Sequence, residues 1–135
     1  MRDYGRLNIS EVETWLPKGD YYFGDPCYAM SDADWTTVCE VLGKIPDIGG
    51  PVRVGESVAC IFSTAHGDGV YQSRGAGSHE IGVDSGTIGI VPWALVDAQS
   101  EHLGLGHKVT FDRDVYCKSD GKTLTFGKYT VDTLV

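Results

Sequence analysis

The chain lacks the features that would place it in a membrane or outside the cell. No run of apolar residues reaches the length of a membrane span. The first six residues are not followed by the apolar stretch that a signal peptide requires. We therefore expect an intracellular protein without a transmembrane segment.

Cysteine is sparse and the spacing of its four residues is wide, with no C-x-x-C pair. A structural zinc site normally uses close pairs of ligands, so this spacing argues against one. Cys60 lies inside the apolar segment 58–62, a position typical of a buried free thiol. A disulfide between Cys27 and Cys39 has no support in a reducing compartment.

Basic residues are scarce as well. The chain has 11 lysines and arginines against 19 aspartates and glutamates, a net charge of −8. Direct nucleic-acid binding is disfavoured, because it depends on neutralising phosphates with a basic surface. An acidic chain fits a basic protein partner or a mimic of DNA, and solubility is the simpler explanation.

Internal repeats, low-complexity tracts and linkers are also absent, so we expect a single domain over residues 1–135. The 18 glycines are scattered, which indicates frequent turns between short strands. The predicted fold is mainly β. We expect an antiparallel meander or a curled sheet, like a barrel-like sandwich, packed around one principal short helix over about residues 31–42.

That helix has clear signals at both ends. Ser31, with Asp34 three residues later, resembles a capping box, and Gly43 is a C-terminal stop. Helical spacing gives one apolar stripe, formed by Trp35, Val38, Cys39 and Leu42.

The strand pattern is less regular. We expect strands at residues 21–23, 58–64, 81–83 and 87–91, with a loop over 45–51. Residues 58–64 are apolar on both faces, as in an inner strand. From 107 to 117 the alternation places four apolar residues on one face: Val109, Phe111, Val115 and Cys117. A hairpin turn is expected at 119–122, and a change of apolar parity predicts a β-bulge at Gly127–Lys128.

Three aspartates lie at the ends of predicted strands, Asp25 and Asp68 directly beside glycine or proline and Asp84 two residues before Gly86. They are Asp25 in G-D-P-C-Y, Asp68 in H-G-D-G-V-Y and Asp84 in V-D-S-G-T-I-G. Each suits a tight turn, because aspartate accepts hydrogen bonds from its own turn backbone. If the three turns share one end of a sheet, they also form the rim of a site.

Three kinds of chemistry are conceivable there. The three carboxylates could hold a divalent cation, although no D-x-D-x-D-G loop is present. Covalent catalysis would need Cys27 or Ser85 with His66 as the base, but Ser85 is not in a G-x-S-x-G elbow.

Ligand binding requires less, because aromatic rings next to the three segments can stack on a planar, nucleotide-like group. We predict eight ligand-binding residues and assign no catalytic residue, metal ligand or cofactor. The eight are Asp25, Tyr28, His66, Asp68, Tyr71, Asp84, Ser85 and Trp93.

The order of the three segments within residues 20–93 resembles a family of small uncharacterised proteins of bacteriophages and bacteria, similar in pattern to the DUF4241 group. The resemblance implies no activity and no catalytic residue. A phage origin would favour an accessory protein for host takeover or counter-defence, acting in the cytoplasm of the host cell.

Our first hypothesis is therefore a non-enzymatic binding protein that sequesters a nucleotide-like signal or a host or defence protein. The second is a divalent-metal-dependent enzyme that uses Asp25, Asp68 and Asp84. The third is a structural or virion-associated interaction module. Homo-oligomerisation remains open under each of them.

Overall fold

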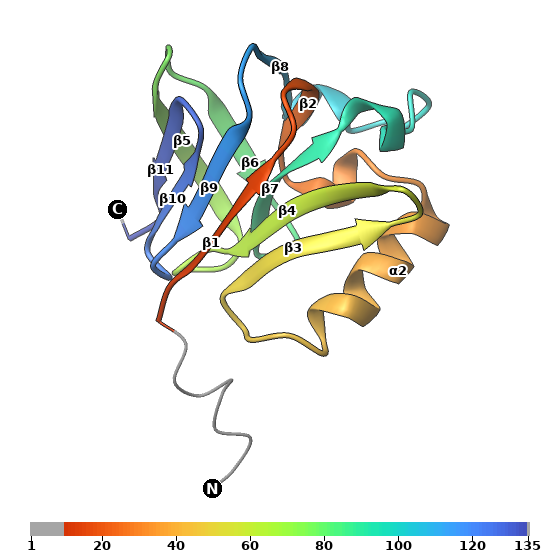
Figure 1. Cartoon of the computed structure of the whole chain (residues 1–135), viewed down its shortest axis with the longest axis horizontal. Helices are drawn as coiled ribbons and strands as arrows, with labels where there is room; N and C mark the ends of the chain where they lie inside the picture. Colours follow the sequence, from red (N-terminus) through yellow and green to blue (C-terminus); the bar gives the residue numbers. More distant parts are fainter. Residues whose placement is uncertain (1–9, 135) are drawn as a thin grey trace, which may run out of the picture.

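The computed structural model describes residues 10–134, which form two antiparallel sheets curled against each other (Figure 1). One sheet has the order β1-β9-β10-β11-β5-β6, with β1 (Val12–Leu16), β9 (Val115–Ser119), β10 (Thr123–Phe126), β11 (Tyr129–Asp132), β5 (Gly69–Gly75) and β6 (Glu80–Val83). The other has the order β3-β4-β7-β2-β8, with β3 (Gly49–Val54), β4 (Ser57–Ser63), β7 (Thr87–Pro92), β2 (Gly19–Gly24) and β8 (His107–Phe111). The predicted mainly β fold with one principal helix is confirmed, and the sheets do not close into a barrel.

Two apolar cores hold the layers together. The inner core lies between the two sheets, and the outer core lies between the five-stranded sheet and the elements that cover it. Strand β4 contributes to both, because Cys60 and Phe62 belong to the inner core while Ala59 and Ile61 belong to the outer one. This confirms the prediction of an inner strand at this position.

Helix α2 (Asp32–Leu42) packs against β3 on the outside of the five-stranded sheet (Figure 1). The Ser31 hydroxyl accepts a hydrogen bond from the Asp34 amide at 3.2 Å, so the predicted cap is present. The predicted stripe is wrong at Cys39, which is exposed; Val41 packs on the core instead. Within residues 10–134, no helix combines the length and the apolar character needed to cross a membrane.

Strand β3 begins inside the predicted loop. The expectation of a loop over 45–51 is wrong from Gly49 onward, since Gly49 pairs with Phe62 and Pro51 with Cys60. Pro46 and the pair Gly49-Gly50 indicate a loop in the sequence, but the two glycines belong to the strand. Pro51 cannot donate to a ladder, and on β3, an edge strand, that missing donor is tolerated.

The segment 107–117 is also not one strand. It forms β8 and β9, which lie in different sheets on either side of a turn at 112–114. The four apolar residues do not share the face of one strand. Their side chains all belong to the inner core, two of them from β8 and two from β9.

The predicted bulge at Gly127–Lys128 is wrong too. Phe126 pairs with Tyr129, so the two intervening residues form a tight turn and the chain reverses there. Gly127 adopts a positive φ of 58°, which glycine accepts without strain. A two-residue reversal and a bulge both shift the apolar parity, and parity alone does not distinguish them.

The remaining turns are of two kinds. Residues 120–122 join β9 to β10 as the predicted hairpin, and residues 76–79 join β5 to β6. The turns at 64–68 and 84–86 are not hairpins, because each carries the chain from one sheet to the other. These two crossovers contain Asp68 and Asp84.

Candidate functional site

The three aspartate segments gather at one end of the five-stranded sheet, which we call the aspartate end. Strand β2 ends there at Gly24, β4 ends at Ser63, and β7 begins at Thr87. The register aligns these positions, since Gly24 pairs with Gly89 and Ser63 with Thr87. The aspartate end therefore consists of residues 24–28, 64–68 and 84–86.

Asp25 is buried at the centre of this end and its carboxylate is fully occupied. Its Oδ1 accepts hydrogen bonds from the Cys27 amide at 2.9 Å and the Ser85 hydroxyl at 2.7 Å. Its Oδ2 accepts from the backbone amides of Asp84 and Ser85, at 2.7 and 2.8 Å. The side chain has no solvent exposure.

This arrangement makes Asp25 a structural carboxylate. A buried charge is tolerated when hydrogen bonds replace its hydration, and here both oxygens find donors. The bonds join the turn after β2 to the crossover between β6 and β7, segments that lie about 60 residues apart. Asp25 fixes the frame of the aspartate end rather than facing a ligand.

Asp68 and Asp84, in contrast, are exposed. Neither side chain has a hydrogen bond or ion pair with any residue in the described range 10–134. Asp68 lies close to the other crossover, because its Oδ1 is 3.9 Å from the point where a Cβ on Gly86 would stand. The carboxylates of Asp68 and Asp84 therefore face solvent, while the buried Asp25 carboxylate joins the backbone segments around residues 27 and 84–85 by hydrogen bonds.

Tyr28 lies beside these carboxylates. Burial raises the pKa of its phenol, and the negative charges of Asp84, Asp25 and Asp68 raise it further. Its ring also contacts the imidazole of His102, with centroids 5.5 Å apart. The aspartate end thus combines an aromatic face with negative charge.

Three other predicted residues maintain the local structure. Tyr71 is buried and its hydroxyl donates to the Gly67 carbonyl at 2.8 Å. The Ser85 hydroxyl is bonded to Asp25 and lies 2.6 Å from the Thr87 hydroxyl. The His66 imidazole lies 3.1 Å from the Leu134 carbonyl oxygen, at the edge of the cluster.

Trp93 does not belong to the aspartate end. It follows Pro92, which pairs with Tyr21 at the opposite end of β2 and β7. The Lys108 ammonium lies over its ring, 4.6 Å from the centroid. The structure therefore does not bring Trp93 together with the other predicted binding residues.

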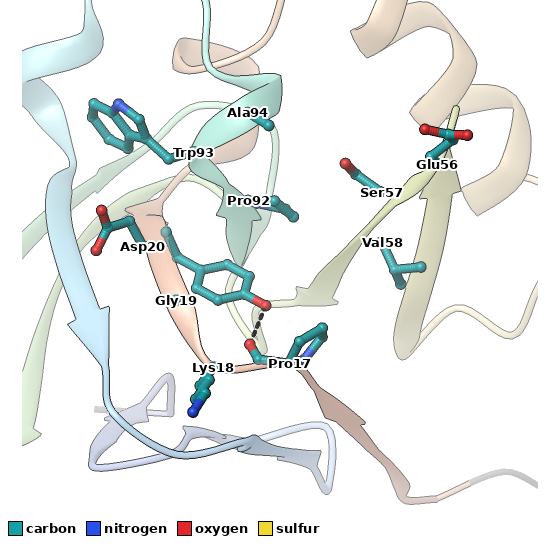
Figure 2. A pocket seen from close by; sticks show the side chains of 11 residues that line it. Pro17, Lys18, Gly19, Asp20, Glu56, Ser57, Val58, Pro92, Trp93 and Ala94 are labelled. Carbon is teal, nitrogen blue, oxygen red and sulfur yellow. Dashed lines mark hydrogen bonds between the residues drawn. The ribbon is translucent and has the colours of Figure 1, made fainter.

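A cavity of about 420 Å³ lies near Trp93, where β2 and β4 begin and β7 ends. In the view of Figure 2, the lining residues Pro92 and Pro17 lie between Trp93 on one side and Glu56 on the other. The Tyr21 hydroxyl donates to the Pro17 carbonyl at 2.6 Å, drawn as the dashed line. Sequence reasoning missed this cavity, because its lining comes from segments that carry no common motif.

The structure gives little support to covalent or metal chemistry. Burial raises the pKa of the Cys27 thiol, and its hydrogen bond to Asp25 raises it further, so a thiolate is disfavoured. All four cysteines are free, Cys27 and Cys39 included. Across residues 10–134, no group of three or more histidine, cysteine, aspartate or glutamate side chains is placed to hold a metal ion.

A further polar group missed by sequence reasoning is the Tyr22 hydroxyl. It is buried in the outer core and has no hydrogen-bond partner in the described part of the chain. Its ring lies against Gly106, where an added Cβ would come within 2.2 Å of the ring carbon that bears the hydroxyl.

We expect Tyr22→Phe to keep the fold and to raise the free energy of unfolding by about 1 kcal/mol, because an unpaired buried hydroxyl is costly. Urea unfolding measures the change. A loss of stability in Tyr22→Phe would contradict the assignment of this hydroxyl as unpaired.

Comparison with known proteins adds no assignment. No family model matches the chain, and no curated protein or solved structure matches it.

Proposed function

We propose that this protein is a non-enzymatic binding protein whose aspartate end holds a cationic group of a basic protein partner. The observation that carries the proposal is the pair of exposed, unpaired carboxylates of Asp68 and Asp84 beside the Tyr28 ring. Carboxylates bind ammonium and guanidinium groups through charge-assisted hydrogen bonds. An aromatic face adds a cation–π contribution.

Charge favours a cationic ligand over an anionic one. The segments 24–28, 64–68 and 84–86 contain no lysine or arginine. A phosphate placed there would meet the negative charges of Asp68 and Asp84, so a nucleotide-like signal is disfavoured at this end. The net charge of −8 extends the same preference to the whole chain and would speed association with a basic surface.

Rigidity supports the same function. Asp25 fixes the backbone at Asp84 and Ser85. The Thr64 and Tyr71 hydroxyls donate to the Gly67 carbonyl beside Asp68, so the backbone that carries both exposed carboxylates is held before a partner binds. A site that is ordered before binding loses less entropy when the partner arrives. The metal-dependent alternative lacks this support, because the oxygens of Asp25 already accept four hydrogen bonds.

Within the proposal, the resemblance of the three segments to bacteriophage proteins favours a role in host takeover or counter-defence. The partner would be a basic host or defence protein in the host cytoplasm. Sequestration requires only tight binding, which suits a small acidic domain without a catalytic group.

The test uses a nona-arginine peptide as the probe and isothermal titration calorimetry at low salt. We expect Asp68→Asn/Asp84→Asn to weaken binding by about tenfold or more, since a hydrogen bond to a charged group contributes about 1.5–3 kcal/mol. The melting temperature should not change, because neither side chain has a hydrogen bond or ion pair within residues 10–134.

Glu40→Gln/Asp112→Asn is the matched control, because both residues are exposed and the loss of charge is the same. We expect this control to change the affinity less than about twofold, as for rim charges far from the contact. Equal weakening in the two double variants would mean that the peptide responds only to net charge, and the proposed site would be rejected.

A further inference from the structure

Two histidines meet where the edges of the two sheets come together. Strand β6 is an edge of the six-stranded sheet and β8 is an edge of the five-stranded sheet. His79 immediately precedes β6, and His107 is the first residue of β8. Their rings lie with centroids 4.5 Å apart and an interplanar angle of 36°.

Both residues are fixed by hydrogen bonds. The His107 Nε2 lies 2.7 Å from the Glu80 carbonyl oxygen, so as an N–H it donates across from β8 to β6. The His79 amide donates to the Ser73 hydroxyl at 3.0 Å, and its carbonyl accepts from the Ser73 amide at 2.8 Å. The two imidazoles therefore belong to the contact that joins one sheet to the other.

The groups in ring contact with His79 are aromatic. Its ring contacts Phe23 of β2, with centroids 6.3 Å apart, and Tyr129 of β11, at 5.5 Å. Strand β5 presents the Ser73 hydroxyl, and the carboxylate of Glu80 is exposed. The Lys108 ammonium lies over Trp93, whereas the Lys128 ammonium donates to the Thr110 carbonyl and lies 5.8 Å from the centroid of the same Tyr129 ring.

We propose that His79 and His107 form an acid-sensitive latch between β6 and β8. With neutral imidazoles the rings pack together and the latch is closed. When His79 takes up a proton, a positive charge enters this contact, and no carboxylate within residues 10–134 is hydrogen-bonded or ion-paired to the ring to offset it. The rings then separate, and the edges of β6 and β8 with the adjacent inner core become accessible.

The direction of the pH effect follows from the environment of His79. Burial lowers its pKa, and the neighbouring His107 lowers it further. The open form therefore takes up a proton more readily than the closed form. The contribution of the latch is present above the ordinary histidine pKa of about 6.5 and is lost as the pH falls below it.

The experiment compares the melting temperature at pH 7.5 and pH 5.0 in the wild type and two variants. His79→Phe keeps a ring between Phe23 and Tyr129 but removes the titrating group. His66→Gln/His102→Gln is the control, because these histidines lie outside the contact and are exposed. We expect the acid-induced fall in melting temperature to be smaller by about 4 °C or more in His79→Phe than in the wild type. The control should keep the full fall.

A second measurement does not depend on any variant. In an NMR titration of the wild-type protein, the His79 ring should titrate below the ordinary histidine pKa of about 6.5. Hydrogen exchange, corrected for the intrinsic rate at each pH, should rise first at the amides of β6 and β8 as the pH falls. A full fall in melting temperature in His79→Phe, or a His79 titration at or above the ordinary histidine pKa, would overturn the proposal.

Discussion

Replacing Asp25 with alanine is expected to lower the free energy of unfolding by about 3 kcal/mol or more, because a buried carboxylate is removed from four donors. The amides of Cys27, Asp84 and Ser85 and the Ser85 hydroxyl would all lose their acceptor. The turn after β2 would then no longer be tied to the crossover between β6 and β7. Urea unfolding followed by circular dichroism measures the loss.

Asp68→Ala is the control for this experiment. Asp68 also sits in a glycine-flanked turn at the aspartate end, but it is exposed and its carboxylate bonds to no described residue. Its change should remain within about 0.5 kcal/mol, as is usual at the surface. If Asp25→Ala were no more destabilising than Asp68→Ala, the structural role assigned to Asp25 would be wrong.

The second large effect is expected at Gly49, the first residue of β3. Its φ is +94°, and an added Cβ would lie 2.2 Å from the backbone carbonyl oxygen of Ile61. That oxygen belongs to β4, an inner strand with buried side chains on both of its faces, and cannot move freely. Gly49→Ala should therefore lower the free energy of unfolding by about 3 kcal/mol, from backbone strain and the clash together.

Gly77 separates these two causes. Its φ is +92°, nearly the same as that of Gly49, but an added Cβ would meet nothing within 4 Å. Gly77→Ala should show only the cost of the conformation, about 1–2 kcal/mol. Equal losses in the two variants, measured by urea unfolding, would show that the close approach of β3 to β4 at Gly49 does not contribute.

The parts of the fold that were predictable depend on local interactions. The start of α2 follows from Ser31, whose hydroxyl bonds to an amide three residues later. The inner position of β4 follows from apolar residues on both of its faces. In each case the physical cause lies within a few residues of the element that it determines.

The predictions are wrong where the interaction that determines the structure lies far away in the sequence, or where one sequence pattern fits two structures. The parity change near Gly127 fits both a bulge and a two-residue turn, and only the pairing of β10 with β11 distinguishes them. The alternation over 107–117 shows which side chains are buried but not that β8 and β9 belong to different sheets.

The same limit applies to the candidate site. The sequence raised the condition that the three aspartate turns share one end of a sheet, and the structure brings them together there. Asp25, Asp68 and Asp84 have equal weight in the sequence, because each lies in a turn-like segment with a glycine or proline within two residues. Their roles differ because the donors to Asp25 include groups 59 and 60 residues away. Trp93 is close to Asp84 along the chain, but β7 lies between them and carries Trp93 to the opposite end of the sheet.

The central claim is that the aspartate end recognises cationic groups through Asp68 and Asp84 on a frame held by Asp25. The most direct measurement is a titration of ¹⁵N-labelled protein with the nona-arginine peptide, followed by NMR. The account predicts that the perturbed amides cluster in residues 24–28, 64–68 and 84–86. Perturbations spread over the acidic surface as a whole, or centred on α2 or on residues 112–114, would contradict it.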